Sequence, residues 1–216
     1  DALDGIMAKA IDKGGIQFRT LNESKGPAVR GPRAQADRVL YKEAVQNLLK
    51  EIKNLSIYED TVDDLIIDHE LKTVTGVITA AGVHVSCKSV VLTTGTFLKG
   101  VIHCGKERLS GGRIGDKSVY GLSNTLKKLN FMIGRLKTGT PPRLDGDTIN
   151  YCILDEQLGD FTPKPFSFLN EKITNKQIAC HITNTTIDTK KLILKNRNLS
   201  PIYNGQIESS GPRYCP

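Results

Sequence analysis

The chain has 216 residues, of which 38% are hydrophobic and 25% are charged, and its formal net charge is +7. A chain of this length can bury the core of one domain or two small ones, and none of its apolar runs approaches the roughly 18 residues of a membrane span. The charge favours an anionic partner. The five scattered cysteines form no CxxC pair and the four histidines lack ligand spacing, which argues against disulfides and metal and favours a reducing compartment.

In chain order, the first elements predicted are a short helix over 2–11 and a strand over 16–21. A basic loop follows at 25–38. The apolar residues of 34–52 recur at helical spacing, which predicts an amphipathic helix.

A region dense in β-strand signals comes next. Short strands are predicted at 55–58, 61–67, 73–79 and 83–87, and tight turns link the last three into an antiparallel meander. Residues 88–94, KSVVLTT, contain an uninterrupted apolar run at 90–92, and we predict a parallel strand buried on both faces. That strand would end at the Thr94-Gly95-Thr96 turn, where a backbone can meet a ligand. The order resembles flavoproteins of the glutathione-reductase type, with two dinucleotide-binding domains, and predicts an α/β fold.

The texture of the sequence changes after about residue 150, with more Asn, Thr, Lys and Phe and weaker periodicity. Before this point a helix is predicted at 119–129 and a strand at 131–136. After it a strand is predicted at 178–183 and a helix at 191–197. We therefore expect three parts: a first domain at 1–147, a smaller inserted α+β subdomain at 148–204, and a return to the first domain at 205–216.

Two loops combine cations with glycine and proline: KGPAVRGPRAQADR at 25–38 and GRLKTGTPPR at 134–143. Glycine lets a backbone approach a ligand, proline fixes φ, and Arg and Lys bind phosphate. The loops contain almost nothing apolar, so we predict that they hold a polyanionic ligand. For each cation the alternative is an ordinary solvent-facing charge. The predicted phosphate-binding residues are Arg30, Arg33, Arg38, Lys137 and Arg143.

The remaining polar residues suggest little chemistry of their own. The carboxylates nearest the loops lack acid–base spacing and are expected to balance arginine charge; they are Asp37, Asp116 and Asp145. Four cysteines lie in or beside strand-like stretches without basic neighbours and are expected to pack in the core; they are Cys87, Cys104, Cys152 and Cys180.

Five segments carry a family resemblance: KGPAVRGPRAQADRVLY (25–41), VVLTTGTFLKGVIHCG (90–105), SGGRIGD (110–116), GRLKTGTPPRLDGDTI (134–149) and GPRYCP (211–216). In order and spacing they resemble the MnmG (GidA) family, the FAD-dependent half of the tRNA wobble-uridine modification complex. The resemblance implies that the first domain is part of an FAD-binding domain. Family members begin with a strand and a GxGxxG turn for the flavin pyrophosphate, which this sequence does not contain. A central fragment, inactive alone, is therefore expected.

The resemblance also implies a catalytic residue. Cys215 in GPRYCP matches a cysteine that the family needs for catalysis. A thiolate that adds to carbon 6 of uracil makes carbon 5 nucleophilic, and the neighbouring Arg213 would favour the thiolate. Attack on carbon 6 and proton transfer both stay open as the role of Cys215, and an ordinary buried cysteine is the structural alternative.

Cofactor contacts are implied at three places. The Thr94–Thr96 turn would lie against FAD, Val62 and Val119 would offer backbone groups, and the GPRY segment would border the nicotinamide. The cofactor-binding residues implied in this way are Val62, Thr94, Gly95, Thr96, Val119, Gly211, Pro212, Arg213 and Tyr214. A plain β-turn is the alternative at 94–96.

The function implied by the resemblance is addition of a carboxymethylaminomethyl (or aminomethyl) group to carbon 5 of U34 in tRNA. FAD, NADH and methylenetetrahydrofolate would be the cofactors. The MnmE GTPase would be the partner, and a homodimer in the cytoplasm, without membrane contact, would be the form. Two alternatives stay open: a non-catalytic module that binds FAD or tRNA, and the folate- and FAD-dependent tRNA uridine-54 methyltransferase.

Overall fold

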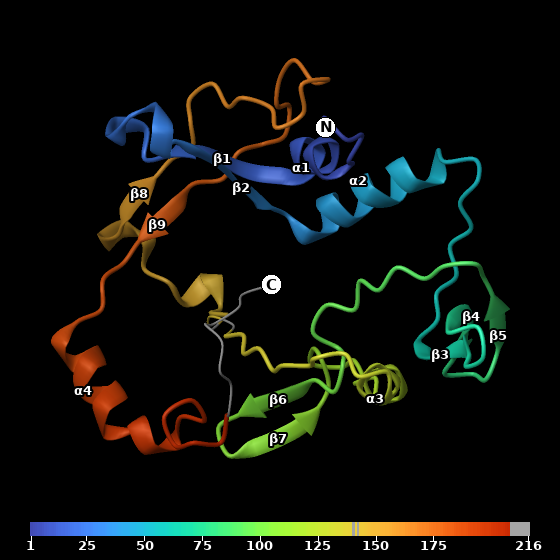
Figure 1. Ribbon diagram of the computed structural model, residues 1–216. Coiled ribbons are helices and arrows are strands. Elements are labelled where there is room, and N and C mark those ends of the chain that lie inside the picture. The colour runs from blue at the N-terminus through green and yellow to red at the C-terminus, as the bar shows by residue number, and fades with distance from the viewer. Residues whose placement is uncertain (140, 142, 208–216) are drawn as a thin grey trace. The chain divides into compact units, whose positions relative to one another are not determined.

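The computed structural model describes residues 1–139, 141 and 143–207, which form a mixed α/β structure of two compact units (Figure 1). Unit 1 joins Asp1–Ile57 with Leu144–Asn184, and unit 2 joins Tyr58–Arg143 with the chain from Thr185 onward. The predicted segment 148–204 is thus divided between the units, and the three predicted domain boundaries stay a prediction.

Unit 1 is organised around an antiparallel pair of strands, β1 (Gly15–Leu21) and β2 (Gly31–Ala36). Helix α1 (Met7–Gly14) precedes β1, and helix α2 (Arg38–Lys50) follows β2 (Figure 1). Helix α2 begins where it does because the Asp37 carboxylate accepts hydrogen bonds from the backbone N–H groups of Val39 and Leu40, at 2.9 and 3.0 Å. The 3-10 turns η1 (Glu23–Lys25) and η2 (Pro27–Val29) connect the two strands.

The core of unit 1 is small and closely packed. Phe18 is 2% exposed and meets Phe166 edge to face, with ring centroids 6.0 Å apart. Ala10 on α1 and Ala44 on α2 are also buried. A Cβ at Gly14 would lie 2.7 Å from the backbone of Tyr41, so α1 and α2 are in backbone contact at that point.

The second stretch of unit 1 packs along β1. It contains η3 (Gly146–Thr148), η4 (Tyr151–Ile153) and the antiparallel pair β8 (Asp155–Gln157) and β9 (Cys180–Ile182). The Asp160 N–H donates to the Phe18 carbonyl at 2.8 Å, and the Ile178 N–H donates to the Ile16 carbonyl at 2.7 Å.

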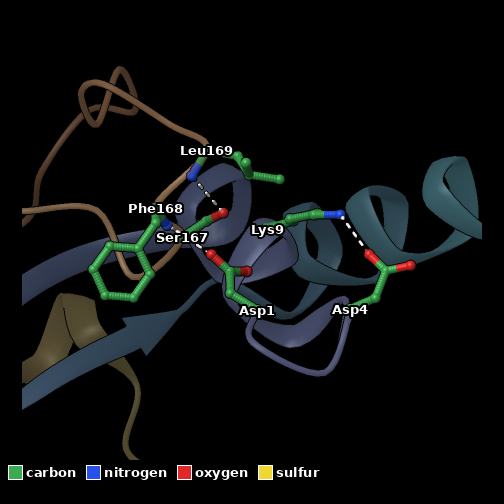
Figure 2. Close-up of polar contacts among 6 residues, drawn as sticks. All are labelled: Asp1, Asp4, Lys9, Ser167, Phe168 and Leu169. Atoms are coloured by element: carbon green, nitrogen blue, oxygen red, sulfur yellow. Dashed lines mark hydrogen bonds and ion pairs between the residues drawn. The ribbon is translucent and has the colours of Figure 1, made fainter.

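The N-terminal residues take part in the same packing. The Phe168 N–H donates to the Asp1 carboxylate at 2.6 Å, and the Leu169 N–H donates to Ser167 Oγ at 3.2 Å (Figure 2). The Lys9–Asp4 ion pair of 3.4 Å lies beside them, at the start of α1. The chain before α1 is therefore anchored to a segment more than a hundred residues later.

Unit 2 contains a three-stranded meander of β3 (Val62–Asp68), β4 (Thr73–Thr79) and β5 (His84–Ser86). It also contains the hairpin of β6 (Val101–Cys104) and β7 (Glu107–Ser110), and the helices α3 (Gly121–Lys128) and α4 (Ile187–Lys195), the latter followed by η5 (Arg197–Leu199). Helix α3 is held to β3 by the Thr125 hydroxyl, which donates to the Asp64 carboxylate at 2.9 Å. The predicted meander is confirmed.

Several predicted elements differ from the structure. The predicted helix at 34–52 begins only at Arg38, because 31–36 pairs with β1; the basic loop at 25–38 is consequently part strand. The predicted strand at 88–94 is wrong, as are those at 55–58 and 131–136. Val91 is 85% exposed, and within the described ranges no neighbouring strand pairs with this segment, so apolarity alone was insufficient.

Candidate functional site

The Thr94-Gly95-Thr96 segment forms a turn, as predicted. Gly95 has φ of +56°, a left-handed conformation that favours glycine. A Cβ added at Gly95 would meet only Phe97 Cδ2, at 3.9 Å, so this side of the backbone is open within the part of the chain described. Thr96 Oγ1 donates to the Gly112 carbonyl at 3.0 Å, which ties the turn to the GGRIGD segment.

The structure brings Val119 to the same turn. Leu98 and Val119 form a parallel bridge. The Lys99 N–H donates to the Val119 carbonyl at 2.9 Å, and the Val119 N–H donates to the Phe97 carbonyl at 2.9 Å. Both backbone groups of Val119 are thus used within the protein, and a ligand beside Val119 would meet its side chain or the neighbouring backbone.

Val62 lies at the start of β3 and is 37% exposed. The residue after it, Asp63, is in close contact with α3, since a Cβ at Gly121 would lie 2.7 Å from the Asp63 carbonyl oxygen. The three predicted cofactor positions 62, 94–96 and 119 therefore belong to one connected part of unit 2.

Two glycines allow close packing around the 94–96 turn. A Cβ at Gly100 would lie 2.5 Å from the Thr96 carbonyl oxygen, and one at Gly112 would lie 2.7 Å from Phe97 Cδ1. The two backbone segments that frame the turn are therefore too close for side chains at these positions. The open side of Gly95 leaves its backbone accessible to a ligand.

The five predicted phosphate-binding residues are divided between the units. Arg30, Arg33 and Arg38 belong to unit 1, while Lys137 and Arg143 belong to unit 2. Arg30 Nε donates to the Glu23 carbonyl at 3.0 Å, and Arg38 is the exposed first residue of α2. Lys137 is partly buried and Arg143 is exposed. Their predicted role in binding phosphate stays a prediction.

Arg33 has the most defined surroundings of these cations. Its Nη2 donates to Gln17 Oε1 at 3.0 Å, and Gln17 is only 1% exposed. The structure adds Arg19, which the sequence analysis missed, directly opposite Arg33 in the β1–β2 register. The alternation of polar residues along a strand could have revealed Arg19, but only once its partner strand was known.

Both arginines line an open depression of about 850 Å³ on unit 1. Its other walls come from 20–25, which includes Lys25 and Glu23, and from 157–160, which ends at Asp160. Three cationic and two acidic side chains line it. Asp160 is already engaged, because its Oδ2 accepts hydrogen bonds from the backbone and hydroxyl of Thr20, both at 2.9 Å.

The carboxylates singled out in the sequence have local roles. Asp116 pairs with Arg113 at 2.6 Å, which confirms charge balance at that position. Asp37 caps α2, and the Asp145 carboxylate accepts from the Asp147 N–H at 3.1 Å at the start of η3. The expectation of arginine balance is therefore wrong for Asp37 and Asp145, whose side chains bond to local backbone instead.

The cysteines are less buried than expected. Cys87 and Cys180 are partly buried, whereas Cys104 and Cys152 are exposed, which contradicts core packing for that pair. Both exposed cysteines lie at short, exposed elements, the end of β6 and the turn η4, so their apolar neighbours do not cover them. Cys215 and the residues Gly211, Pro212, Arg213 and Tyr214 lie outside the described residues.

Among the described residues, no group of three or more His, Cys, Asp or Glu side chains is arranged to hold a metal ion. No helix there is long and apolar enough to cross a membrane.

His103 on β6 is a titratable residue that the sequence did not single out. Burial lowers the pKa of His103 below its ordinary value of 6.5, and the charges of Arg108 and Arg135 lower it further. Its Nδ1 is buried and has no hydrogen-bond partner within the described part of the chain. These conditions favour the neutral imidazole.

The family described as glucose inhibited division protein A (GidA) matches residues 1–216. A curated protein of Granulibacter bethesdensis, described as tRNA uridine 5-carboxymethylaminomethyl modification enzyme MnmG, is 54% identical over 217 residues. That match covers 100% of this chain and 34% of the relative, so the chain spans about a third of the relative's length.

Two solved structures agree with the sequence match. GidA of Aquifex aeolicus in crystal form I is 44% identical, with a TM-score of 0.87 over 100% of this chain and 37% of the other. Crystal form II gives 43% identity and a TM-score of 0.84 over 92% of this chain and 34% of the other. The fold and the match along the full sequence lead to one conclusion: the chain belongs to the GidA family.

Proposed function

We propose that this chain is part of an FAD-dependent tRNA-modifying enzyme that adds a carboxymethylaminomethyl (or aminomethyl) group to carbon 5 of the wobble uridine U34. The observation that carries the proposal is the 54% identity, over the whole chain, to a protein described as a tRNA uridine 5-carboxymethylaminomethyl modification enzyme. The open Gly95 turn supports it, because the family resemblance expects a flavin there.

In this proposal the residues Val62, Thr94, Gly95, Thr96 and Val119 hold FAD, together with the segment from Gly211 to Tyr214. Bound FAD would supply redox chemistry, with NADH as the hydride source and methylenetetrahydrofolate as the one-carbon donor. The protein supplies orientation. Backbone contact at Gly95 would fix the position of the flat ring system, and glycines at 100 and 112 would keep the supporting segments in contact.

The catalytic role falls to Cys215. Carbon 5 of uracil is a weak nucleophile until a thiolate adds to carbon 6. The Cys215 thiolate would make this addition or act in proton transfer, and Arg213 would stabilise its negative charge. The proposed partners are tRNA and the MnmE GTPase, and the proposed form is a cytoplasmic homodimer.

The test is made on tRNA from cells in which the gene that encodes this sequence is disrupted. Mass spectrometry of anticodon fragments should show that the carbon 5 substituent of U34 is lost. The intact gene should restore it, and a gene with Cys215→Ser should not. Unchanged U34 in the disrupted cells would overturn the proposed function, whereas rescue by Cys215→Ser would remove only Cys215 from the mechanism.

The same measurement separates the two alternatives. A uridine-54 methyltransferase would leave U34 unchanged on disruption and remove the methyl group at position 54. A non-catalytic module would leave both positions modified.

A further inference from the structure

We propose that Arg19 and Arg33, side by side on β1 and β2, form a binding site for a backbone phosphate of RNA. That this RNA is tRNA rests on the proposed function. The geometry of the site is independent of the cofactor turn and of Cys215.

The first observation is the register of the two strands. Arg19 and Arg33 are directly opposite each other on an antiparallel pair. Opposed residues point to the same face of a sheet, with Cβ atoms about 5 Å apart. Like charges on directly opposed residues of a sheet are destabilising in the absence of an anion. Neither guanidinium has a carboxylate oxygen within ion-pair distance among the described residues. A bound phosphate would relieve the repulsion.

The second observation is that both side chains are held in place and still have donors to spare. Arg19 Nη1 donates to the Leu158 carbonyl at 3.4 Å, and Arg33 Nη2 donates to Gln17 Oε1 at 3.0 Å. The Nε of Arg33 is buried and lacks a partner in the described part of the chain. A guanidinium presents several N–H donors in a planar fork that matches a phosphate.

Gln17 acts as a positioning residue for Arg33. Its Nε2 donates to the Gln157 carbonyl at 2.9 Å, which fixes the amide orientation and directs Oε1 toward Arg33. Cys180 Sγ also contacts that oxygen, at 3.3 Å. The buried amide therefore sets the direction of the guanidinium before any ligand binds, which lowers the ordering cost of binding.

The third observation is the shape and lining of the depression. It is open, and Lys25 adds a third cation at its rim. The wall at 157–160 packs closely against β1, since a Cβ at Gly159 would lie 2.7 Å from the Phe18 carbonyl oxygen. Among the described residues, no aromatic side chain lines this depression. A dinucleotide would need a surface for its rings, whereas an RNA backbone needs only the cations, so the lining favours RNA.

The experiment measures binding of the 216-residue chain to an unmodified tRNA transcript, by fluorescence anisotropy over a range of salt concentrations. Arg19→Gln and Arg33→Gln should each weaken binding about tenfold and reduce the salt slope by about one. Lys42→Gln is the matched control, because it removes an exposed cation of α2 away from the depression. Its affinity should change less than about twofold.

A second set of variants separates binding from folding. Arg19→Lys keeps the charge without the planar fork and should fall between the wild type and Arg19→Gln. Circular dichroism and thermal melting identify any variant that fails to fold. Wild-type affinity in folded Arg19→Gln and Arg33→Gln would overturn the site.

Competition identifies the source of the phosphate. Inorganic phosphate, FAD and NADH at concentrations well above that of the tRNA should displace it only weakly. Efficient displacement by FAD or NADH, lost in Arg19→Gln, would replace RNA with a dinucleotide as the ligand. This site and the proposed function can fail separately. If gene disruption removes the U34 modification but Arg19→Gln and Arg33→Gln bind tRNA as tightly as the wild type, only this site is overturned. If the two arginine variants bind tRNA more weakly but U34 is still modified after gene disruption, only the proposed function is overturned.

Discussion

Asp12 accepts a hydrogen bond from the backbone N–H of Ser167 at 2.9 Å, although the two residues are 155 positions apart in the sequence. The same carboxylate accepts from the Phe166 N–H at 2.7 Å and from Asn170 Nδ2 at 2.8 Å. Asp12 is 5% exposed. One buried side chain therefore holds the later segment of unit 1 against α1.

The first prediction concerns this anchor. Asp12→Asn keeps the shape but places an amide N–H₂ where an oxygen accepts, so at least one buried donor loses its partner. We expect the free energy of unfolding to fall by about 2 kcal/mol, measured by urea denaturation. Asp4→Asn is the control, because Asp4 is exposed and its ion pair with Lys9 should contribute little. Equal losses in the two variants would contradict the anchoring role.

The second prediction concerns the contact between α1 and α2. Gly14→Ala places a Cβ 2.7 Å from the Tyr41 backbone, which cannot move aside as a flexible side chain would. We expect a loss of about 1–3 kcal/mol, seen as a lower melting temperature. Gly31→Ala is the matched control, since its Cβ would meet nothing within 4 Å. A melting temperature unchanged by Gly14→Ala would show that the helices are less closely packed.

The third prediction is a pH dependence from His103. Its folded pKa lies below 6.5, so the unfolded state binds the proton more readily. The free energy of unfolding should therefore decrease as the pH falls through about 6.5 toward the folded pKa, and stay at its full value above that window. His103→Gln should flatten this part of the profile in a series of urea denaturation measurements at different pH values. Identical profiles for wild type and His103→Gln would refute the assignment.

The fourth prediction concerns flavin retention. The 216 residues contain no GxGxxG turn for a pyrophosphate, although the Gly95 turn is present. The purified chain mixed with FAD should therefore lose most of its flavin absorbance on a desalting column. The full-length relative from Granulibacter bethesdensis serves as the comparison. Yellow protein eluting from the column with the 216-residue chain would contradict the prediction.

The sequence predicted best those elements whose partners lie close to them along the chain. The meander was predicted because β3, β4 and β5 are joined by short turns, with Gly82 at φ of +79° before β5. The predicted helix at 34–52 was wrong at its N-terminal end, because residues 31–36 pair with β1 as a strand. The polar residues and Pro32 of this segment gave no sign of that pairing. The predicted strand at 88–94 was wrong because, in the described ranges, no strand lies beside this segment to pair with it.

The candidate sites show the same division. The turn at Gly95 could be predicted from three consecutive residues, whereas the contacts that frame it, at Gly100 and Gly112, became visible only in the structure. Arg19 could not, because its importance depends on a partner 14 residues later in register and on a loop beyond residue 156. Motifs reveal residues that act within one segment, whereas sites assembled across segments require the fold.

The discontinuous path of unit 1 has a consequence for synthesis on the ribosome. The chain leaves this unit after Ile57 and returns at Leu144. The backbone partners of Asp12 are Phe166 and Ser167, so this buried carboxylate must wait for residues about 155 positions later before its hydrogen bonds can form. Such late, distant contacts slow folding and prolong exposure of the nascent first segment. The first segment of unit 1 therefore stays without its native partners until the later segment has been synthesised.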